Sequence, residues 1–377
     1  MDYRSEFGDF EGVTYLNAAS EGPLPLKSVR ASQTALEWKK LPHKIPETEY
    51  FGLPDRIRAL LAKLLGGEPG EFAVTSGASS GMSAVASNFD WKPDDEVLIG
   101  RGEFPAHIAT FMPLADAGRL RVKIVAPRDR FLTAGDYIQQ FTPHTRLVSV
   151  SVVRFDDGAR IEARQLAEAC RKAGISLLLD ASQCACATPM NLHEIGADFV
   201  VSSGYKWLLG PYGTGFFWVR RESMQKLRPG PSYWAALEGA SKFHSLPLDK
   251  ISVVPGARRW DAAETANFTN LAALQASLEF IDSVGIQTIY NHTQQLVSQI
   301  IERLPRDTCV LASPAEAANR GSYICVAARK SERTKELYEK LQKAQVMVSL
   351  RENALRISPH LYNTDRDIAK LISILSA

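Results

Sequence analysis

Short apolar runs alternate with amphipathic stretches through the first two thirds of the chain. Runs rich in Val, Ile and Leu occur at residues 71–75, 96–99, 121–125, 146–150, 176–180 and 199–202. Between them, segments such as 161–173 place apolar residues on one helical face. Because nearly continuous apolar strands separated by helices are buried on both faces, the pattern predicts an α/β fold with a mostly parallel sheet. We predict seven strands, including an antiparallel one within 213–220.

A different pattern begins after Pro255-Gly256. A long helix with one apolar stripe spans 267–283, and further helices alternate with strands at 322–327 and 354–358. Because this pattern of helices and strands differs from that of the first part of the chain, we predict a second, smaller domain of α+β type. The predicted parts are an N-terminal segment over 1–20, a large domain over 21–255 and a small C-terminal domain over 256–377.

Composition and charge narrow the classes of function. The 377 residues are 45% hydrophobic and 23% charged, as in ordinary globular proteins. A formal charge of +2 gives no reason to expect nucleic acid or an anionic membrane as a partner. No run of 18 apolar residues occurs, and the first residues are polar and acidic, so we expect neither a membrane span nor a signal peptide.

The five cysteines are odd in number and lie mostly in apolar stretches. This usage is typical of reduced thiols and indicates a cytoplasmic protein. Cys184 and Cys186 lie close together, but no second Cys/His pair at zinc spacing accompanies them. We therefore expect no metal site.

A carboxylate and an amine follow two neighbouring strands of the predicted sheet. Asp180 ends the run Leu-Leu-Leu-Asp, at the edge where open α/β sheets bind ligands. Lys206 follows the next strand between Tyr205 and Trp207, an apolar setting that lowers a lysine pKa toward the value a Schiff base needs. Taken singly, the aspartate is typical of a helix cap and the lysine of a solvated charge.

Together, Asp180 and Lys206 meet the two demands of a pyridoxal ring. A carboxylate keeps the ring nitrogen protonated through a charge-assisted hydrogen bond, and a lysine amine meets the aldehyde on the opposite side of the ring. The pair predicts an enzyme that carries pyridoxal 5'-phosphate (PLP) as a Schiff base on Lys206.

Two weaker signals accompany this pair. Thr75-Ser-Gly-Ala-Ser79 joins a strand to a helix through small residues, which is how backbone amides are presented to a phosphate. No Gly-Lys-Ser/Thr follows, so the segment is not a Walker motif. Phe104 follows another strand and suits stacking on a flat ring, although an aromatic at such a position is more often part of the core.

These stretches resemble the class V aminotransferase family of fold-type I PLP enzymes, which includes cysteine desulfurases and isopenicillin N epimerase-like proteins. The resemblance extends from Tyr15 to Asn363 and is most specific in Ser203-Gly-Tyr-Lys-Trp-Leu-Leu-Gly-Pro-Tyr-Gly-Thr-Gly215. It implies that Lys206 and Asp180 are catalytic and that the large domain binds PLP. The other cofactor contacts that it implies are Gln183 at the phenolic oxygen, Phe104 on the ring, and Ala78, Ser79, Ser203 and Tyr205 at the phosphate.

The resemblance also implies how substrate and subunits are arranged. Arg356 matches the arginine that grips the α-carboxylate of an amino-acid substrate, a task that suits a forked guanidinium. Asn17 and Ala18 match the N-terminal loop that lines the substrate site. Thr265 matches a residue that reaches the phosphate of the neighbouring subunit, which implies a homodimer with shared active sites.

Departures from the family pattern narrow the set of reactions that we expect of this chain. Desulfurases usually have His where this chain has Phe104, and they carry a nucleophilic Cys in a loop that is short and free of Cys here, at 346–353. Val152 replaces a residue that is usually polar near the cofactor. We therefore expect an aminotransferase and not a cysteine desulfurase. The alternatives are a lyase that performs C–S or other β-elimination, an epimerase, or a non-catalytic binding protein on the same fold.

Overall fold

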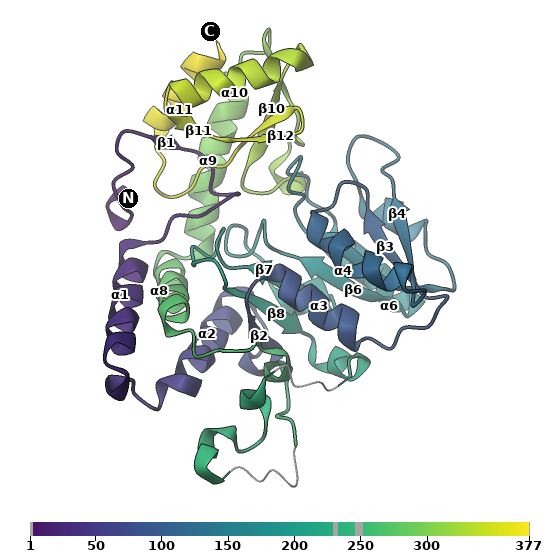
Figure 1. Ribbon diagram of the computed structural model, residues 1–377. Coiled ribbons are helices and arrows are strands. Elements are labelled where there is room, and N and C mark those ends of the chain that lie inside the picture. The colour runs from purple at the N-terminus through teal and green to yellow at the C-terminus, as the bar shows by residue number, and fades with distance from the viewer. Residues whose placement is uncertain (1–2, 229–232, 246–251, 377) are drawn as a thin grey trace.

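The computed structural model describes residues 3–228, 233–245 and 252–376, and a seven-stranded sheet lies at its centre (Figure 1). The strands are β2 (Phe72–Thr75), β3 (Glu96–Gly100), β4 (Arg121–Val125), β5 (Thr145–Ser151), β6 (Ser176–Asp180), β7 (Phe199–Ser203) and β8 (Gly215–Val219). Their order is β2-β8-β7-β6-β5-β3-β4. The five neighbouring strands β7, β6, β5, β3 and β4 pair in parallel, whereas β8 is antiparallel to both of its neighbours, β7 and β2. The predicted α/β fold, with its antiparallel strand, is confirmed.

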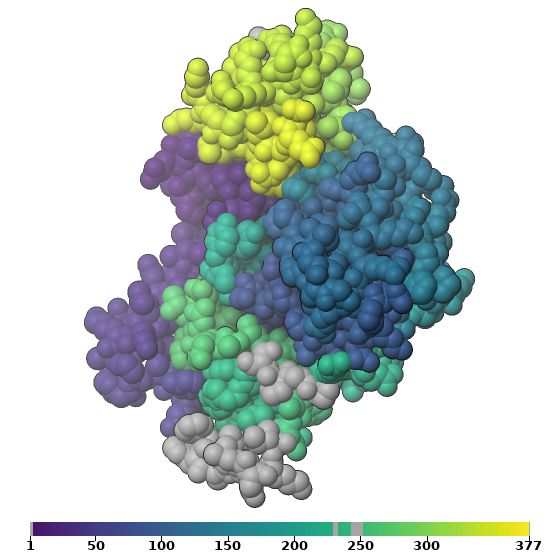
Figure 2. Space-filling view, turned by 45° about the vertical axis from the view of Figure 1, so that its right-hand side comes forward, coloured from purple at the N-terminus to yellow at the C-terminus, as the bar shows by residue number. Residues whose placement is uncertain are grey.

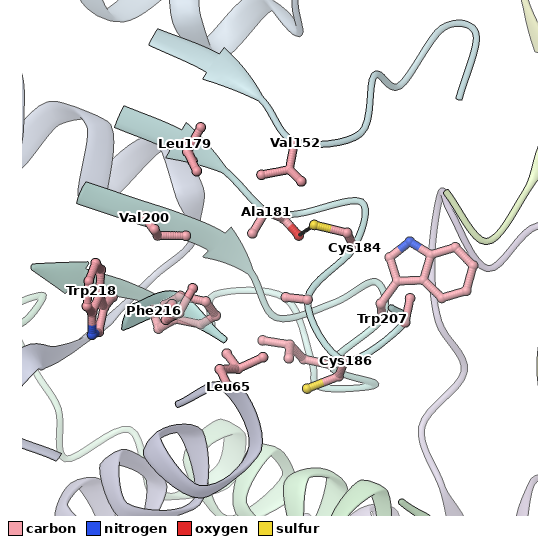
Figure 3. Close-up of a cluster of buried hydrophobic side chains, with 14 of the residues drawn as sticks. Leu65, Val152, Leu179, Ala181, Cys184, Cys186, Val200, Trp207, Phe216 and Trp218 are labelled. Atoms are coloured by element: carbon pink, nitrogen blue, oxygen red, sulfur yellow. Dashed lines mark hydrogen bonds between the residues drawn. The ribbon is translucent and has the colours of Figure 1, made fainter. Parts of the chain in front are cut away.

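Both faces of this sheet are buried, which explains its continuous apolar strands. The covering helices include α2 (Glu49–Leu65), α3 (Ala78–Asn88), α4 (Pro105–Asp116), α5 (Ala134–Ile138), α6 (Ala163–Ala173), α7 (Leu192–Ile195) and α8 (Phe268–Val284). Val200 of β7 packs in one cluster with residues of α2, α6 and α8, whereas its neighbour Val201 packs in another with residues of α3 and α4. Figure 3 shows part of the first cluster, in which Val200 and Phe216 lie near Leu65.

Helices α1 (Leu26–Lys40), α2 and α4 are not among the predicted elements. The only residues that α1 buries are Ser28 and Ala35, so its sequence has no clear apolar stripe. Proline inside α2 and α4, at Pro54 and Pro113, interrupts the helical pattern of both. Both α1 and α2 pack against α8, so their positions depend on a partner far along the chain. None of the described helices combines the length and apolar character needed to cross a bilayer.

A second, antiparallel sheet follows in the order β12-β13-β10-β9. Its strands are β9 (Cys309–Leu311), β10 (Ile324–Ala328), β12 (Ser349–Arg351) and β13 (Ala354–Ile357). Residues of α9 (Ile286–Arg303), α10 (Thr334–Lys343) and α11 (Asp365–Leu375) share one apolar cluster with this sheet. The predicted strands at 322–327 and 354–358 correspond to β10 and β13, while β9 and β12 are additional. The predicted domain boundary at residues 255/256 stays a prediction.

The N-terminal segment lies against this C-terminal part of the chain. Strand β1 (Thr14–Tyr15) pairs in parallel with β11 (Val346–Met347), and Asn17 forms an isolated bridge with Ser358. In Figure 2 the N-terminal residues (purple) lie directly against the C-terminal part (yellow). The pairing brings residues from the two ends of the chain together.

A buried ion pair fixes β2, the strand that leads into α3. Arg58 of α2 donates a hydrogen bond to Asp261, and the side chains are 5% and 6% exposed. The other carboxylate oxygen of Asp261 accepts the N–H of Val74 in β2 at 2.8 Å. Arg58 also donates to the carbonyl of Phe72 at 3.2 Å. The pair therefore ties α2 and the loop before α8 to β2.

Replacing Asp261 with Ala should lower the free energy of unfolding by about 3–5 kcal/mol, because it leaves the Arg58 charge buried without its buried partner. Urea unfolding followed by circular dichroism measures this change. Asp55→Ala is the matched control, since Asp55 also contacts Arg58 at 2.6 Å but is 56% exposed, and we expect less than about 1 kcal/mol. Equal effects of the two substitutions would contradict this role of Asp261.

Candidate active site

A cavity of about 170 Å³ lies at the carboxyl ends of β6 and β7. It is lined by Ser76, Gly77, Ala78, Ser79, Ser80, Phe104, Ala106, Asp180, Ser182, Ser203, Tyr205 and Lys206. Seven of the residues predicted to contact a cofactor are in this set: Ala78, Ser79, Phe104, Asp180, Ser203, Tyr205 and Lys206. The parallel sheet brings them together because its loops meet at one edge.

Lys206 is almost fully buried, with 7% of its surface exposed. Its amine nitrogen lies 5.2 Å from the ring centre of Phe104 and 5.5 Å from that of Tyr205. Burial lowers the pKa of Lys206 to about 8; Asp180 opposes this shift, and Arg356 and Arg351 add to it. Near neutral pH the neutral amine, the form that a nucleophile requires, is therefore much more populated than in an ordinary lysine, although the charged form still predominates.

The N-terminal segment packs directly on the loop that carries this lysine. The N–H of Gly22 donates to the carbonyl of Tyr205 at 2.9 Å. A Cβ atom at Gly22 would lie 2.0 Å from the carbonyl oxygen of Lys206, so the close approach requires glycine. Tyr205 in turn stacks on Tyr212 with ring centres 4.1 Å apart. These contacts fix the position of the lysine loop.

Asp180 belongs to a buried polar network that includes two residues not predicted as site residues, His107 and Glu103. Asp180 is 5% exposed, and its Oδ2 lies 3.8 Å from Nε2 of His107. The same nitrogen lies 3.7 Å from Oε2 of Glu103, while Nδ1 of His107 lies 2.8 Å from Oγ of Ser149. Glu103 also accepts hydrogen bonds from the N–H and the hydroxyl of Ser151 at 3.1 and 2.5 Å. His107 therefore links two buried carboxylates.

The N-terminus of α3 faces the cavity with small residues. Gly77 precedes the helix with φ of 150°, and the N–H of Ala78 donates to Oγ of Ser203 at 3.4 Å. The first N–H groups of a helix have no acceptor within it and favour an anion. Ser76, Ser80 and Ser182 add hydroxyls around the cavity. Ser76 lies in the segment predicted to present its amides to a phosphate, whereas Ser182 was not predicted. This end of the cavity suits a phosphate.

Two predicted cofactor residues, Gln183 and Thr265, are not among the described residues that line the cavity. Nε2 of Gln183 donates to the carbonyl of Ala19, and its Oε1 accepts the indole N–H of Trp207, each at 3.0 Å. Thr265 is 7% exposed and precedes α8. Val152 packs in the hydrophobic cluster of Figure 3, and its N–H donates to the carbonyl of Asp180. The roles predicted for Gln183 and Thr265 stay predictions.

The predicted substrate residues meet where the N-terminal segment pairs with the C-terminal sheet. Arg356 is 1% exposed and donates to Oγ of Ser20 at 2.5 Å and to the carbonyl of Phe155 at 3.0 Å. Oδ1 of Asn17 accepts the hydroxyl of Ser349 at 2.7 Å. The N–H of Ala18 donates to the carbonyl of Ser358 at 3.1 Å. Arg356, Asn17 and Ala18 therefore lie in one region, and Ser20 joins them as a residue that was not predicted.

Fold and site together are those of a fold-type I protein that uses PLP, with a buried carboxylate and a buried lysine at adjacent strand ends. The chain belongs to the aminotransferase class-V family, whose model matches residues 48–371. Its cofactor is pyridoxal 5'-phosphate, as in that family. The family predicted from the sequence is confirmed.

Relatives extend over nearly the whole chain. An uncharacterised aminotransferase of Bacillus subtilis is 27% identical over 100% of this chain and 97% of its own. Isopenicillin N epimerase of Streptomyces clavuligerus is 25% identical over 97% of this chain and 94% of its own. A solved structure of a C-DES mutant, with glycine covalently linked to its PLP cofactor, has a TM-score of 0.89 at 19% identity over 99% of this chain and 98% of its own. The last likeness concerns the fold.

The pKa of Lys206 predicts how cofactor attachment depends on pH. Only the neutral amine attacks an aldehyde, and its fraction rises as pH rises through the pKa. For apoprotein mixed with PLP, we expect the rate of attachment, followed by absorbance, to rise with a midpoint near the lowered pKa of about 8. An ordinary lysine would give a midpoint near 10.4, and such a value would contradict the effect of burial. Lys206→Ala protein is the control and should show no attachment.

Proposed function

We propose that this chain is a PLP-dependent aminotransferase that acts at the α-carbon of an amino acid. The observation that carries the proposal is that Asp180 and Lys206 line one cavity from the ends of adjacent strands. Residues of the C-terminal sheet, above all Arg356, would supply the contact with the substrate.

The residues of the cavity fit PLP by their chemistry. Asp180 would hold the ring nitrogen, Lys206 the aldehyde carbon, and Phe104 one face of the ring. The phosphate would lie at the N-terminus of α3, held by Ala78, Ser79, Ser203 and Tyr205. Gln183 is not among the described residues that line the cavity, and its proposed place at the phenolic oxygen rests on the family resemblance. When bound, PLP supplies an electron sink for negative charge that develops at the substrate α-carbon.

The side chains of this chain would then bind the substrate and move its proton. Lys206, whose pKa is about 8, suits the role of the base that removes and returns the proton at the α-carbon. The N–H of Ser182 donates to Asp180 at 2.8 Å and would help to hold this carboxylate in place beside the ring nitrogen. Arg356 would bind the α-carboxylate through two hydrogen bonds. Burial of Lys206 and Asp180 limits the access of water to the reacting atoms.

Transamination is the reaction that we propose, and the relative named as an uncharacterised aminotransferase supports it. The same residues also serve a lyase that performs C–S or other β-elimination, or an epimerase, the activity named for the Streptomyces relative. A non-catalytic binding protein on this fold is the lesser alternative.

We further propose that the chain is not a cysteine desulfurase. Its five cysteines are unpaired and buried, and none is among the described residues that line the cavity. Burial raises the pKa of Cys184 and of Cys325 to about 12, whereas a nucleophilic cysteine needs a thiolate near neutral pH. Unpaired cysteines also support a location in the cytoplasm, where thiols stay reduced.

Product analysis tests the proposed reaction. Holoenzyme given an amino acid and a 2-keto acid should exchange their amino and keto groups one for one. Lys206→Ala should abolish this exchange, and Asp180→Asn should retain PLP but react about 100-fold more slowly, because an amide cannot keep the ring nitrogen protonated. Borohydride reduction followed by peptide mapping should place the cofactor on Lys206. Pyruvate released with ammonia or sulfide would indicate a lyase, and racemised amino acid without a keto acid would indicate an epimerase.

We propose in addition that the active unit is a homodimer with shared sites. Thr265 is predicted to serve a phosphate, yet it is not among the described residues that line the cavity of its own chain. In a homodimer, the Thr265 of each chain would instead contact the phosphate in the site of its partner.

Mixing two variants, one impaired and one inactive, tests the shared site. Thr265→Ala should weaken PLP retention, and Lys206→Ala should abolish attachment. In a mixed dimer one site would carry both defects and the other neither, so subunit exchange should restore activity in proportion to the fraction of mixed dimer. A fully active monomer in sedimentation at assay concentration would contradict the proposal, as would mixing without any recovery.

A further inference from the structure

Two arginines lie on the same face of the C-terminal sheet. In the antiparallel pair of β12 and β13, Ser349 lies opposite Arg356 and Arg351 lies opposite Ala354. Residues two apart on a strand share one face, so Arg351 lies on the face of Ser349 and Arg356. The two arginines are thus diagonal neighbours, a spacing that long side chains span.

Both guanidinium groups converge on one hydroxyl. Oγ of Ser20 accepts from Arg356 at 2.5 Å and from Arg351 at 3.4 Å, and it also lies 2.6 Å from Oγ of Ser349. The Nε atoms of both arginines are buried and have no hydrogen-bond partner within the described part of the chain. Arg356 also donates to the carbonyl of Phe155 at 3.0 Å and Arg351 to that of Leu350 at 3.5 Å, but the shared hydroxyl and these carbonyls leave the two Nε–H donors without an acceptor.

Neither cation has a counter-charge from the protein. Arg58 and Arg154 pair with Asp261 and Asp156, but no carboxylate of the described residues forms an ion pair with Arg351 or Arg356. Burial lowers the pKa of Arg356, and the charge of Arg351 lowers it further. Two neighbouring cations with unused donors are unfavourable in a buried region unless anions join them.

The pair also lies close to the reacting amine. Ser20, which accepts hydrogen bonds from both arginines, closely precedes Gly22, and the N–H of Gly22 donates to the carbonyl of Tyr205 next to Lys206. Both arginines also lower the pKa of Lys206. Neither arginine is among the described residues that line the cavity, so an amino acid held at Lys206 would reach them with the groups that extend beyond it. Its α-carboxylate neutralises one of them and leaves the other without a counter-charge.

From this geometry we infer that the substrate carries a second anionic group on its side chain, and that Arg351 binds this group while Arg356 binds the α-carboxylate. The substrate class is a dicarboxylic amino acid or its sulfinate or sulfonate counterpart. Arg356 is assigned to the α-carboxylate because it is the deeper of the two, whereas Arg351 is half-buried toward the end of the hairpin. The inference rests on the proposed function, since it takes an amino acid as the substrate.

A pair of non-reacting amino acids tests the inference by binding alone. 2-Methylaspartate and isovaline both lack the α-proton, and they differ in that a carboxylate of the first is replaced by a methyl group in the second. Titration of the holoenzyme, followed by the absorbance of the cofactor, gives the dissociation constant of each. We expect 2-methylaspartate, or its homologue 2-methylglutamate, to bind at least about 10-fold more tightly than isovaline, the effect of one charged hydrogen bond.

Variants assign the preference to a residue. Arg351→Gln should weaken binding of the dicarboxylate about 10-fold and leave binding of isovaline within about 2-fold, whereas Arg351→Lys should keep part of the preference. Arg356→Gln should weaken both compounds together. Arg333→Gln removes an exposed charge from the same part of the chain, with 47% of its side chain exposed, and should change neither compound.

Several results would overturn the inference. Equal weakening of both compounds by Arg351→Gln would mean that Arg351 shares the α-carboxylate, and no weakening of either would mean that it only stabilises the fold. Equal binding by the unmodified holoenzyme would also refute a second anionic group. If no amino acid changed the absorbance of cofactor fixed on Lys206, the proposed function itself would fail, which these titrations distinguish from a lost preference.

Discussion

The amine of Lys206 and the carboxylate of Asp180 are both buried, so both lose hydration, and the structure depends on how their charges are balanced. Burial favours the neutral amine, while the nearby carboxylate favours the charged one, and the balance gives a pKa of about 8. Strand β6, which ends at Asp180, and strand β7, which precedes the loop of Lys206, pair in parallel, so their ends cannot separate without breaking the sheet. The glycine contact at Gly22 then holds the lysine loop from the other side.

The position of the C-terminal sheet relative to this pair depends on the first residues of the chain. Strand β1 pairs with β11, and Ser20 contacts Arg356, so one short segment touches both the lysine loop and the small sheet. The central sheet carries the residues suited to proton transfer, while the small sheet carries those suited to recognising carboxylates. A shift of the N-terminal segment would therefore change the distance between the two groups of residues.

Much of the fold and part of the site could be predicted from the sequence, because the central strands are buried on both faces and read as continuous apolar runs. Asp180 and Lys206 follow such runs directly, so strand order alone indicates their proximity. Helix α1 could not be predicted, since it buries few residues and depends on α8, more than two hundred residues away in the sequence. His107 and Arg351 could not be predicted either, because their contacts form across elements that no local pattern joins.

The charges around the cavity are separated by sign, and this separation can orient a substrate before any chemistry occurs. Asp180 and Glu103 lie on the side of the central sheet, linked through His107, while Arg351 and Arg356 lie on the side of the C-terminal sheet. Lys206 is influenced by both groups, since Asp180 raises its pKa and the two arginines lower it. An amino acid that entered this field, as we propose, would have its carboxylate attracted to the arginines and its ammonium group to the carboxylates, which would favour presenting the amine toward Lys206. Because relatives that match nearly the whole chain carry different reaction names, the groups that orient the substrate are where differences among them are to be sought.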